Sequence, residues 1–126
     1  MSQTVKQTYT SMTEVMKSKF IAIVMPLENV DTFKETVNSV RKEHKKAKHV
    51  VYAYKVGNLT KSCDDQEPKG TAGRPLMELL NKRNLDKIAV IVVRYFGGTK
   101  LGASRLLRTY VDAANSAINV AELIEL

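Results

Sequence analysis

The chain has 126 residues, of which 44% are hydrophobic and 26% charged, and its formal net charge is +7. These values fit one soluble globular domain and exclude a wholly disordered chain or a fibre. The single cysteine, Cys63, excludes a disulfide framework and every zinc module built from several cysteines, and it favours a reducing compartment. No export signal is visible, and the longest apolar runs, residues 20–27 and 88–93, fall far short of the roughly 20 residues of a membrane-spanning helix. We therefore expect a cytoplasmic protein without membrane contact.

The first third of the chain predicts two strands and a helix. Residues 12–17 and 20–25 read as a pair of short β-strands that meet at residues 18–19 and stop at Pro26. Asn29 or Asp31 can cap the helix that follows. Its inward positions have helical spacing and are Val30, Phe33, Val37 and Val40.

The remainder alternates strands and helices. Residues 49–56 are rich in β-branched and aromatic side chains and predict a strand, and residues 57–73 read as a loop. Thr71 is expected to cap a short helix, and the apolar run 88–93 predicts a central strand. A final helix follows Gly102, with Ala103, Leu106, Leu107, Tyr110, Val111, Ala114 and Ile118 facing inward. This order predicts a two-layer α+β domain with a mixed sheet packed on helices.

Positive charge is concentrated in two segments. Residues 41–61 hold seven Lys or Arg against one acid, Glu43, and residues 87–111 hold five and no acid. Their charges of +6 and +5 exceed the total of +7, so the rest of the chain is net negative. This asymmetry favours a polyanionic partner, although a lysine-rich helix end is also typical of a solvated surface.

An acidic loop at residues 63–75 is the first candidate site. Three carboxylates within four residues repel one another and need compensation, from a hard cation such as magnesium or from Arg side chains and backbone N–H groups. Turn chemistry favours the structural alternative, in which the acids close a tight loop and cap a helix, and no metal is assigned. The loop residues of interest are Asp64, Asp65, Glu67, Gly70, Thr71 and Gly73.

The second candidate site, residues 94–108, runs from a strand end through a glycine turn into a helix start. This geometry suits phosphate, because free N–H groups and the helix dipole point at the turn while Lys and Arg supply charge. Ala103 stands where a P-loop needs its lysine, which excludes an NTPase of that class. The candidate phosphate-binding residues are Arg94, Tyr95, Gly97, Gly98, Lys100, Arg105 and Arg108, with Lys45, Lys46 and Lys48 as a wider electrostatic rim.

Several single residues have more than one interpretation. Tyr95 either stacks on a base or packs under the turn, whereas Phe96 is expected to pack in the core. Cys63, His44 and His49 are possible nucleophile and bases, but neither histidine has a visible partner constellation, and no catalytic residue is assigned. His49 is expected to be hydrogen-bonded at the start of its strand.

With these residues identified, the chain resembles the IMPACT family, also called YigZ-like, from about residue 18 to residue 110. The matching segments are residues 18–22, 47–49 with 52–54, 64–75 and 94–110. Two positions depart from the usual family pattern, since Gln66 replaces a glycine and Ser104-Arg105 replaces a small, glycine-rich step. The resemblance implies a fold like the second domain of a small-subunit ribosomal protein. Many bacterial members carry a further ferredoxin-like domain, so we expect either a minimal member or a fragment.

We interpret the chain as a non-enzymatic cytosolic module, without a cofactor, that binds RNA or a ribonucleoprotein surface near the translation machinery. The basic segments favour this function, and the resemblance adds that eukaryotic relatives act as translational regulators through protein partners. Two alternatives stay open: a small phosphorylated-ligand binder or metal-assisted enzyme that uses the acidic loop, and a protein-interaction adaptor. A shared site requires the two motifs to meet, and we expect Arg94 or Lys100 to lie close to Asp65 or Glu67.

Overall fold

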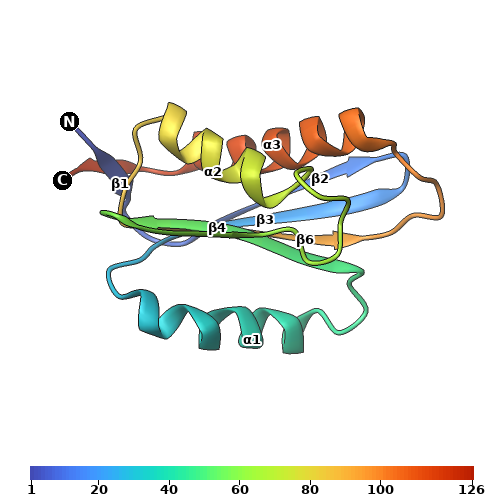
Figure 1. The fold of residues 1–126 in the computed structure, drawn as a ribbon, viewed down its shortest axis with the longest axis horizontal. Coiled ribbons are helices and arrows are strands. Elements are labelled where there is room, and N and C mark those ends of the chain that lie inside the picture. The colour runs from blue at the N-terminus through green and yellow to red at the C-terminus, as the bar shows by residue number, and fades with distance from the viewer.

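A computed structural model describes residues 1–126 in full, as a five-stranded sheet with helices on both faces (Figure 1). The elements are β1 (Gln3–Val5), β2 (Tyr9–Val15), β3 (Ser18–Pro26), the short 3-10 helix η1 (Val30–Thr32), α1 (Phe33–Glu43), β4 (His49–Val56), β5 (Leu59–Cys63), α2 (Gly73–Lys82), β6 (Ile88–Tyr95), α3 (Ala103–Val120) and β7 (Leu123–Glu125). The strand order is β2-β3-β6-β4-β5, and β1 pairs with β7 in a small separate sheet. None of the helices combines the length and apolarity needed to cross a membrane.

The α+β class is confirmed, but the arrangement differs from the prediction in two respects. Helix α1 covers one face of the sheet while α2 and α3 cover the other, so the domain has three layers rather than two (Figure 1). The sheet was expected to be mixed, yet each neighbouring pair of its strands is antiparallel. Strands β3 and β4 run parallel to each other across α1, but β6 lies between them and is antiparallel to both.

Strand β6 is central, as its apolar run predicts. Its residues from Ile88 to Arg94 are all buried, and successive side chains of a strand point to opposite faces. Val90 and Val92 therefore join the core beneath α2 and α3, while Ile91 and Val93 join the core beneath α1. Complete burial of one such side chain stabilises the fold by roughly 1.5–3 kcal/mol, which explains why the run is apolar at every position.

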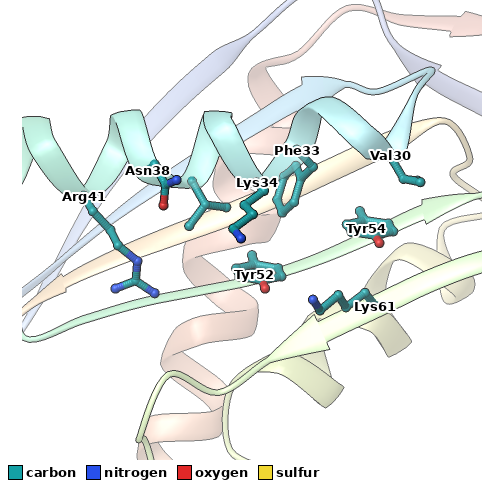
Figure 2. A pocket seen from close by; sticks show the side chains of 9 residues that line it. Val30, Phe33, Lys34, Asn38, Arg41, Tyr52, Tyr54 and Lys61 are labelled. Carbon is teal, nitrogen blue, oxygen red and sulfur yellow. The ribbon is translucent and has the colours of Figure 1, made fainter.

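Helix α1 packs on the sheet through aromatic contacts (Figure 2). The Phe33 ring meets the rings of Tyr52 and Tyr54 edge-on, with centroids 5.0 Å and 5.1 Å away. The predicted cap is present at Asn29, whose side-chain oxygen accepts a hydrogen bond from the N–H of Asp31 at 2.9 Å, and it caps η1, the short helix that leads into α1.

Three short strands were not predicted, and one turn was misplaced. Strand β5 falls in the expected loop because its residues are mostly exposed and lack an apolar alternation. Strands β1 and β7 are three residues each, too short for a periodic signal. The β2–β3 hairpin turns at Met16-Lys17 instead of residues 18–19, since both turn residues adopt positive φ, 50° and 69°, without a glycine to mark the position.

Helix α3 is confirmed, but its buried face is rotated from the expected one. Ala103 and Leu107 are exposed, and the buried side includes residues that the spacing did not single out. These additional buried residues are Thr109, Ala113 and Ala117. Their small side chains let the helix lie close to the sheet, where Tyr110 meets Phe20 edge-on at 5.2 Å.

Asp86 connects the start of β6 to the β4–β5 hairpin through hydrogen bonds. Its Oδ1 atom accepts hydrogen bonds from the N–H of Gly57 at 2.8 Å and from the N–H of Lys87 at 2.7 Å. The Gly57 bond, followed by the Lys87 bond and the nearby lysine charges, holds the pKa of Asp86 below its ordinary value. The ionised form is therefore the one that the fold stabilises.

We predict that Asp86→Asn lowers the melting temperature at pH 7 and that this difference closes as the pH falls. Because the folded pKa lies below the unfolded one, the stabilisation is complete above the unfolded pKa of about 3.9 and is lost as the pH drops through the folded pKa. Thermal unfolding of both proteins between pH 7 and pH 2 measures the effect. A difference that is independent of pH would contradict it.

Candidate functional site

Asp64 closes the acidic loop and supplies the anion at the start of α2. Its Oδ1 accepts from the N–H of Ala72 at 3.1 Å and of Gly73 at 2.8 Å, and its Oδ2 accepts from Gly70 at 3.0 Å. A carboxylate on the first N–H groups of a helix is stabilised by the helix dipole. The predicted cap was wrong: Thr71 donates its hydroxyl to the Pro68 carbonyl instead, because Asp64 already occupies the helix end.

Asp65 ties the same loop to the opposite face of the sheet. Its Oδ2 accepts from the N–H of Val50 at 2.7 Å and from Arg41 Nη1 on α1 at 3.2 Å. Its backbone carbonyl accepts from His49 Nδ1 at 2.7 Å, which confirms the expected hydrogen bond of His49 at the start of β4. The loop is thus anchored to α1 and β4.

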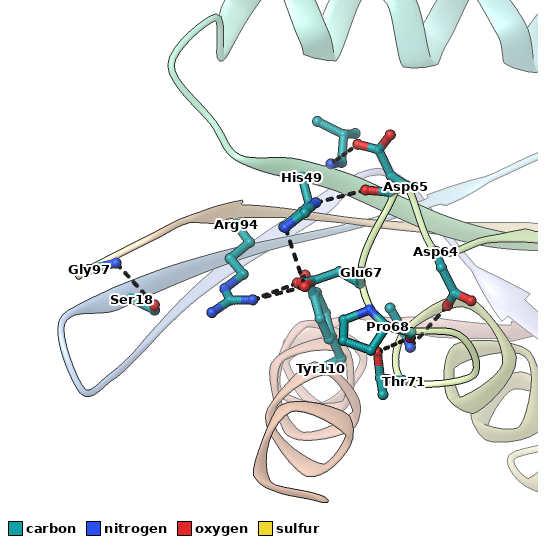
Figure 3. A network of polar contacts seen from close by, with 12 residues as sticks. Ser18, His49, Asp64, Asp65, Glu67, Pro68, Thr71, Arg94, Gly97 and Tyr110 are labelled. Carbon is teal, nitrogen blue, oxygen red and sulfur yellow. Dashed lines mark hydrogen bonds and ion pairs between the residues drawn. The ribbon is translucent and has the colours of Figure 1, made fainter. Parts of the chain in front are cut away.

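Glu67 is the centre of the polar network in Figure 3. Arg94 Nη1 donates to both carboxylate oxygens, at 3.0 Å and 2.7 Å, and the Tyr110 hydroxyl donates to Oε2. His49 Nε2 lies 3.3 Å from Oε1. The Glu67 and Arg94 side chains are only 3% and 6% exposed. Burial, and then the hydrogen bond to Glu67, raises the pKa of Tyr110, which keeps its hydroxyl protonated as a donor.

The contacts of the acidic loop are those that the structural interpretation expects, with each carboxylate bonded to donors within the chain. Asp64 binds backbone N–H groups, Asp65 binds β4 and α1, and Glu67 binds β6 and α3. Because the three carboxylates point to different partners, they do not form one ligand set for a cation. The contact between Arg94 and Glu67 also confirms that the two motifs meet.

A pocket of about 370 Å³ lies where the two motifs meet. The acidic loop contributes Glu67 and Pro68, β4 begins at its edge, and the glycine turn and the start of α3 form the rest. The lining residues are Lys48, His49, Glu67, Pro68, Arg94, Phe96, Lys100, Leu101, Gly102, Ala103 and Leu106. The pocket thus joins cations, an exposed aromatic ring and a helix N-terminus.

Tyr95 packs inside the domain, whereas Phe96 lies at the surface. Tyr95 faces α1, where its hydroxyl lies 2.5 Å from His44 Nδ1, so it is outside the pocket. The expectation that Phe96 packs in the core was wrong, because Phe96 is 47% exposed and its ring centre lies 5.7 Å from the Arg94 guanidinium carbon. The signal was available in the sequence: positions 94 and 96 share one face of an extended strand, and position 95 points to the other.

The predicted glycines serve backbone geometry. A Cβ on Gly97 would lie 2.2 Å from the Lys17 carbonyl carbon, and a Cβ on Gly73 would lie 2.7 Å from the Cys63 nitrogen. Gly70, Gly98 and Gly102 adopt positive φ of 80°, 93° and 80°. These residues shape the loop and the turn, and they let both approach neighbouring backbone closely.

The predicted cations divide into two groups. Lys48, Arg94 and Lys100 line the pocket, whereas Arg105 and Arg108 are exposed on the first turns of α3 outside it. Lys45 and Lys46 are exposed in the turn after α1 and do not line it. His49 lines the pocket although it was not among the predicted site residues.

A second hollow, of about 350 Å³, lies on the other face of the sheet between α1, β4 and β5 (Figure 2). Tyr52 and Tyr54 form its floor, and burial, followed by the contact with Cys63, raises the pKa of Tyr52. Its cations are Lys34, Arg41 and Lys61. The sequence did not indicate this hollow, because its residues come from four separate elements and β5 was read as a loop.

The comparison with known protein families matches the Impact N-terminal domain to residues 16–118. The chain belongs to the IMPACT family. It is 37% identical over 114 residues to the IMPACT family member YvyE of Bacillus subtilis and 37% identical over 110 residues to YigZ of Escherichia coli. These alignments cover 88% and 83% of this chain but only 52% and 54% of the two relatives, so the chain spans about half of their length.

Solved structures show the same fold. A crystal structure described as a hypothetical protein superposes with a TM-score of 0.90 at 32% identity, and the match covers 98% of this chain and 62% of that one. The two-domain translational regulator Yih1 superposes with a TM-score of 0.52 at 19% identity over 95% of this chain and 47% of its own. At that identity the likeness to Yih1 shows the fold alone.

Gln66, where the IMPACT pattern usually has glycine, lies in a left-handed turn. Its φ is 68° and that of Asp65 is 44°, so two successive side-chain-bearing residues occupy a region that favours glycine. The bonds of Asp65 and Glu67 on either side hold the backbone in this conformation.

We predict that Gln66→Gly raises the free energy of unfolding by about 0.5–1 kcal/mol, because relief of the left-handed strain exceeds the added flexibility of the unfolded chain. Urea unfolding measures the change. Lys69→Gly is the control, since Lys69 lies in the same loop without positive φ and its replacement should give no gain. Equal effects at both positions would disprove the argument.

We predict that Arg94→Met destabilises the fold by about 3–5 kcal/mol, because it leaves Glu67 buried without its cation. Arg108→Met, at an exposed site without an ion pair, should change stability by no more than about 0.5 kcal/mol. If the single variant does not fold, Glu67→Gln combined with Arg94→Met should recover part of the loss, since no charge is then stranded. Urea denaturation followed by circular dichroism tests all three variants, and a double variant less stable than Arg94→Met would refute the explanation.

Proposed function

We propose that this IMPACT family member is a non-enzymatic, cytoplasmic module that binds RNA or an RNA-containing surface through the region around the 370 Å³ pocket. One observation carries the proposal: the acids of this region are bonded within the fold, while Lys48 and Lys100 at the pocket are exposed and form no ion pair. Glu67 is 3% exposed and is bonded to Arg94 and Tyr110, and His49 Nε2 lies 3.3 Å from it. The outward field of the region is therefore positive.

The free cations supply phosphate contacts. Lys48, Lys100, Arg105 and Arg108 form no ion pair with any carboxylate in the chain. Their charges are thus available to a polyanion, which gains affinity by releasing its condensed counterions. The exposed Phe96 ring adds a surface on which a base can stack, a contact that tolerates any sequence. This combination fits single-stranded RNA better than a protein partner.

The link to translation rests on the family and the fold. Yih1, which has this fold, is a translational regulator. The chain's own basic surface fits a ribosome-associated partner, because such surfaces are rich in phosphate. Additional protein partners are compatible with this role, and no cofactor is required for it.

We predict that the affinity for mixed-sequence single-stranded RNA falls steeply with salt. Replacing both Lys100 and Arg108 with Ala should flatten the slope of log K against log salt by about 1.4, which is about 0.7 for each phosphate that the variant no longer neutralises. Fluorescence anisotropy between about 50 and about 300 mM salt measures the slope. The matched control replaces Lys55 and Lys82, which removes the same charge near the opposite end of β6 and should leave the slope unchanged.

The proposal fails if RNA does not bind at low salt, or if binding does not respond to salt. An equal decrease of the slope in the two double variants would show that net charge, and not this surface, attracts RNA. Retained binding to a protein partner with no RNA affinity would favour the adaptor alternative.

A further inference from the structure

One buried polar group in the pocket has no partner. Arg94 is 5% exposed, and its Nη1 is bonded to Glu67, but its Nε–H has no hydrogen-bond acceptor in the structure. A buried donor left unpaired costs about 1–3 kcal/mol, and more when it is charged, so such donors are nearly always satisfied. Arg94 lines the pocket, so an acceptor bound there would lie beside its guanidinium.

The N-terminus of α3 opens on the same pocket. The 18-residue helix begins after Gly102 without a side-chain cap and without an acid in its first turn, and Gly102, Ala103 and Leu106 line the pocket. The first N–H groups of a helix have no partner within it, and the dipole favours an anion there. Helix α2 shows how such groups are satisfied in this fold, through the Asp64 carboxylate.

The charge of the pocket defines the ligand further. Lys48, Lys100 and Arg94 line it, and the sole carboxylate of the lining is Glu67. Three positive charges and one negative leave +2, before any charge on His49 is counted. A phosphomonoester carries nearly two negative charges near neutral pH, whereas a phosphodiester carries one. The monoester matches this excess.

We infer that the pocket takes a terminal phosphate, the phosphomonoester at one end of an RNA strand, and not an internal phosphodiester. This inference rests on the proposed RNA-binding function and names the part of the RNA that the site recognises. The phosphate accepts from Arg94 Nε and from the first N–H groups of α3, and Lys48 and Lys100 balance its charge.

The burial of Arg94 favours the phosphate at the end of an RNA strand as the ligand of the pocket. A group that reaches a side chain only 6% exposed has to project into the pocket. An internal phosphodiester carries a ribose on each side and presents two free oxygens, whereas a terminal phosphate carries one substituent and presents three. Phe96, 47% exposed at the pocket wall, is placed to stack on the terminal base.

The test compares one ten-nucleotide RNA in three forms: unphosphorylated, with a 5′-phosphate and with a 3′-phosphate. Fluorescence anisotropy at about 150 mM salt should show at least a tenfold tighter Kd for one phosphorylated form. Inorganic phosphate should remove that advantage and leave the remaining affinity intact. Which phosphorylated form binds tighter identifies the end that is recognised.

A substitution at the helix start makes the test specific. Ala103→Asp places a carboxylate at the α3 N-terminus, where the dipole stabilises it, so the helix remains folded while the phosphate is repelled. The advantage of the terminal phosphate should fall to less than twofold. Asn119→Asp makes the same charge change at the other end of α3, where Arg83 already contacts the side chain, and should retain the full advantage.

The outcomes separate the two proposals. If all three RNA forms bind equally, the terminal-phosphate inference is overturned and RNA binding stands. If no RNA binds but inorganic phosphate raises the melting temperature of the wild type and not of Ala103→Asp, the phosphate pocket stands and the RNA-binding function is overturned. A loss of the advantage in Asn119→Asp would also overturn the inference, because charge alone would then explain it.

Discussion

The Glu67 carboxylate joins four separate parts of the chain. The acidic loop supplies it, β6 supplies Arg94, α3 supplies Tyr110 and β4 supplies His49. Burying an ion pair removes both charges from water, which offsets most of their attraction, so the pair adds little net stability compared with apolar residues of the same size. The ion pair instead positions the acidic loop. Because each partner of Glu67 belongs to a packed element, the Glu67 carboxylate is fully hydrogen-bonded in only one arrangement of the loop.

This placement determines the electrostatics of the surface. Each carboxylate of the loop accepts hydrogen bonds from donors within the fold. The solvent-exposed charges of the region are therefore mainly positive, although the loop itself is rich in carboxylates. In the sequence, the acidic loop and the basic turn look like opposing charges that would cancel. In three dimensions the carboxylates of the loop are bonded, Glu67 to the buried Arg94, while Lys48 and Lys100 stay exposed without ion pairs and form part of the candidate binding surface.

The sequence predicted the elements whose burial leaves a periodic or continuous signal. Strand β6 is apolar at each position from Ile88 to Val93 because both of its faces are covered, and α1 repeats its apolar residues at helical spacing. Strand β5 escaped prediction since an edge strand with mostly exposed side chains has no such pattern. Topology predicted that Arg94 or Lys100 lies close to Asp65 or Glu67, and the structure selects Arg94 and Glu67. The role of His49 was not predicted, because it depends on how the loop folds back over β4.

The same loop also links the two faces of the sheet. Asp65 contacts Arg41 beside the hollow under α1, and two residues later Glu67 contacts Arg94 in the pocket beside α3. Residues 65 and 66 lie in left-handed conformations between these anchors, so the backbone has little freedom to move one carboxylate without the other. The strain at Gln66 is tolerated because the bonds on both sides of it outweigh its cost. The loop is therefore bonded to both faces of the sheet, and these bonds set the position of Glu67 in the pocket.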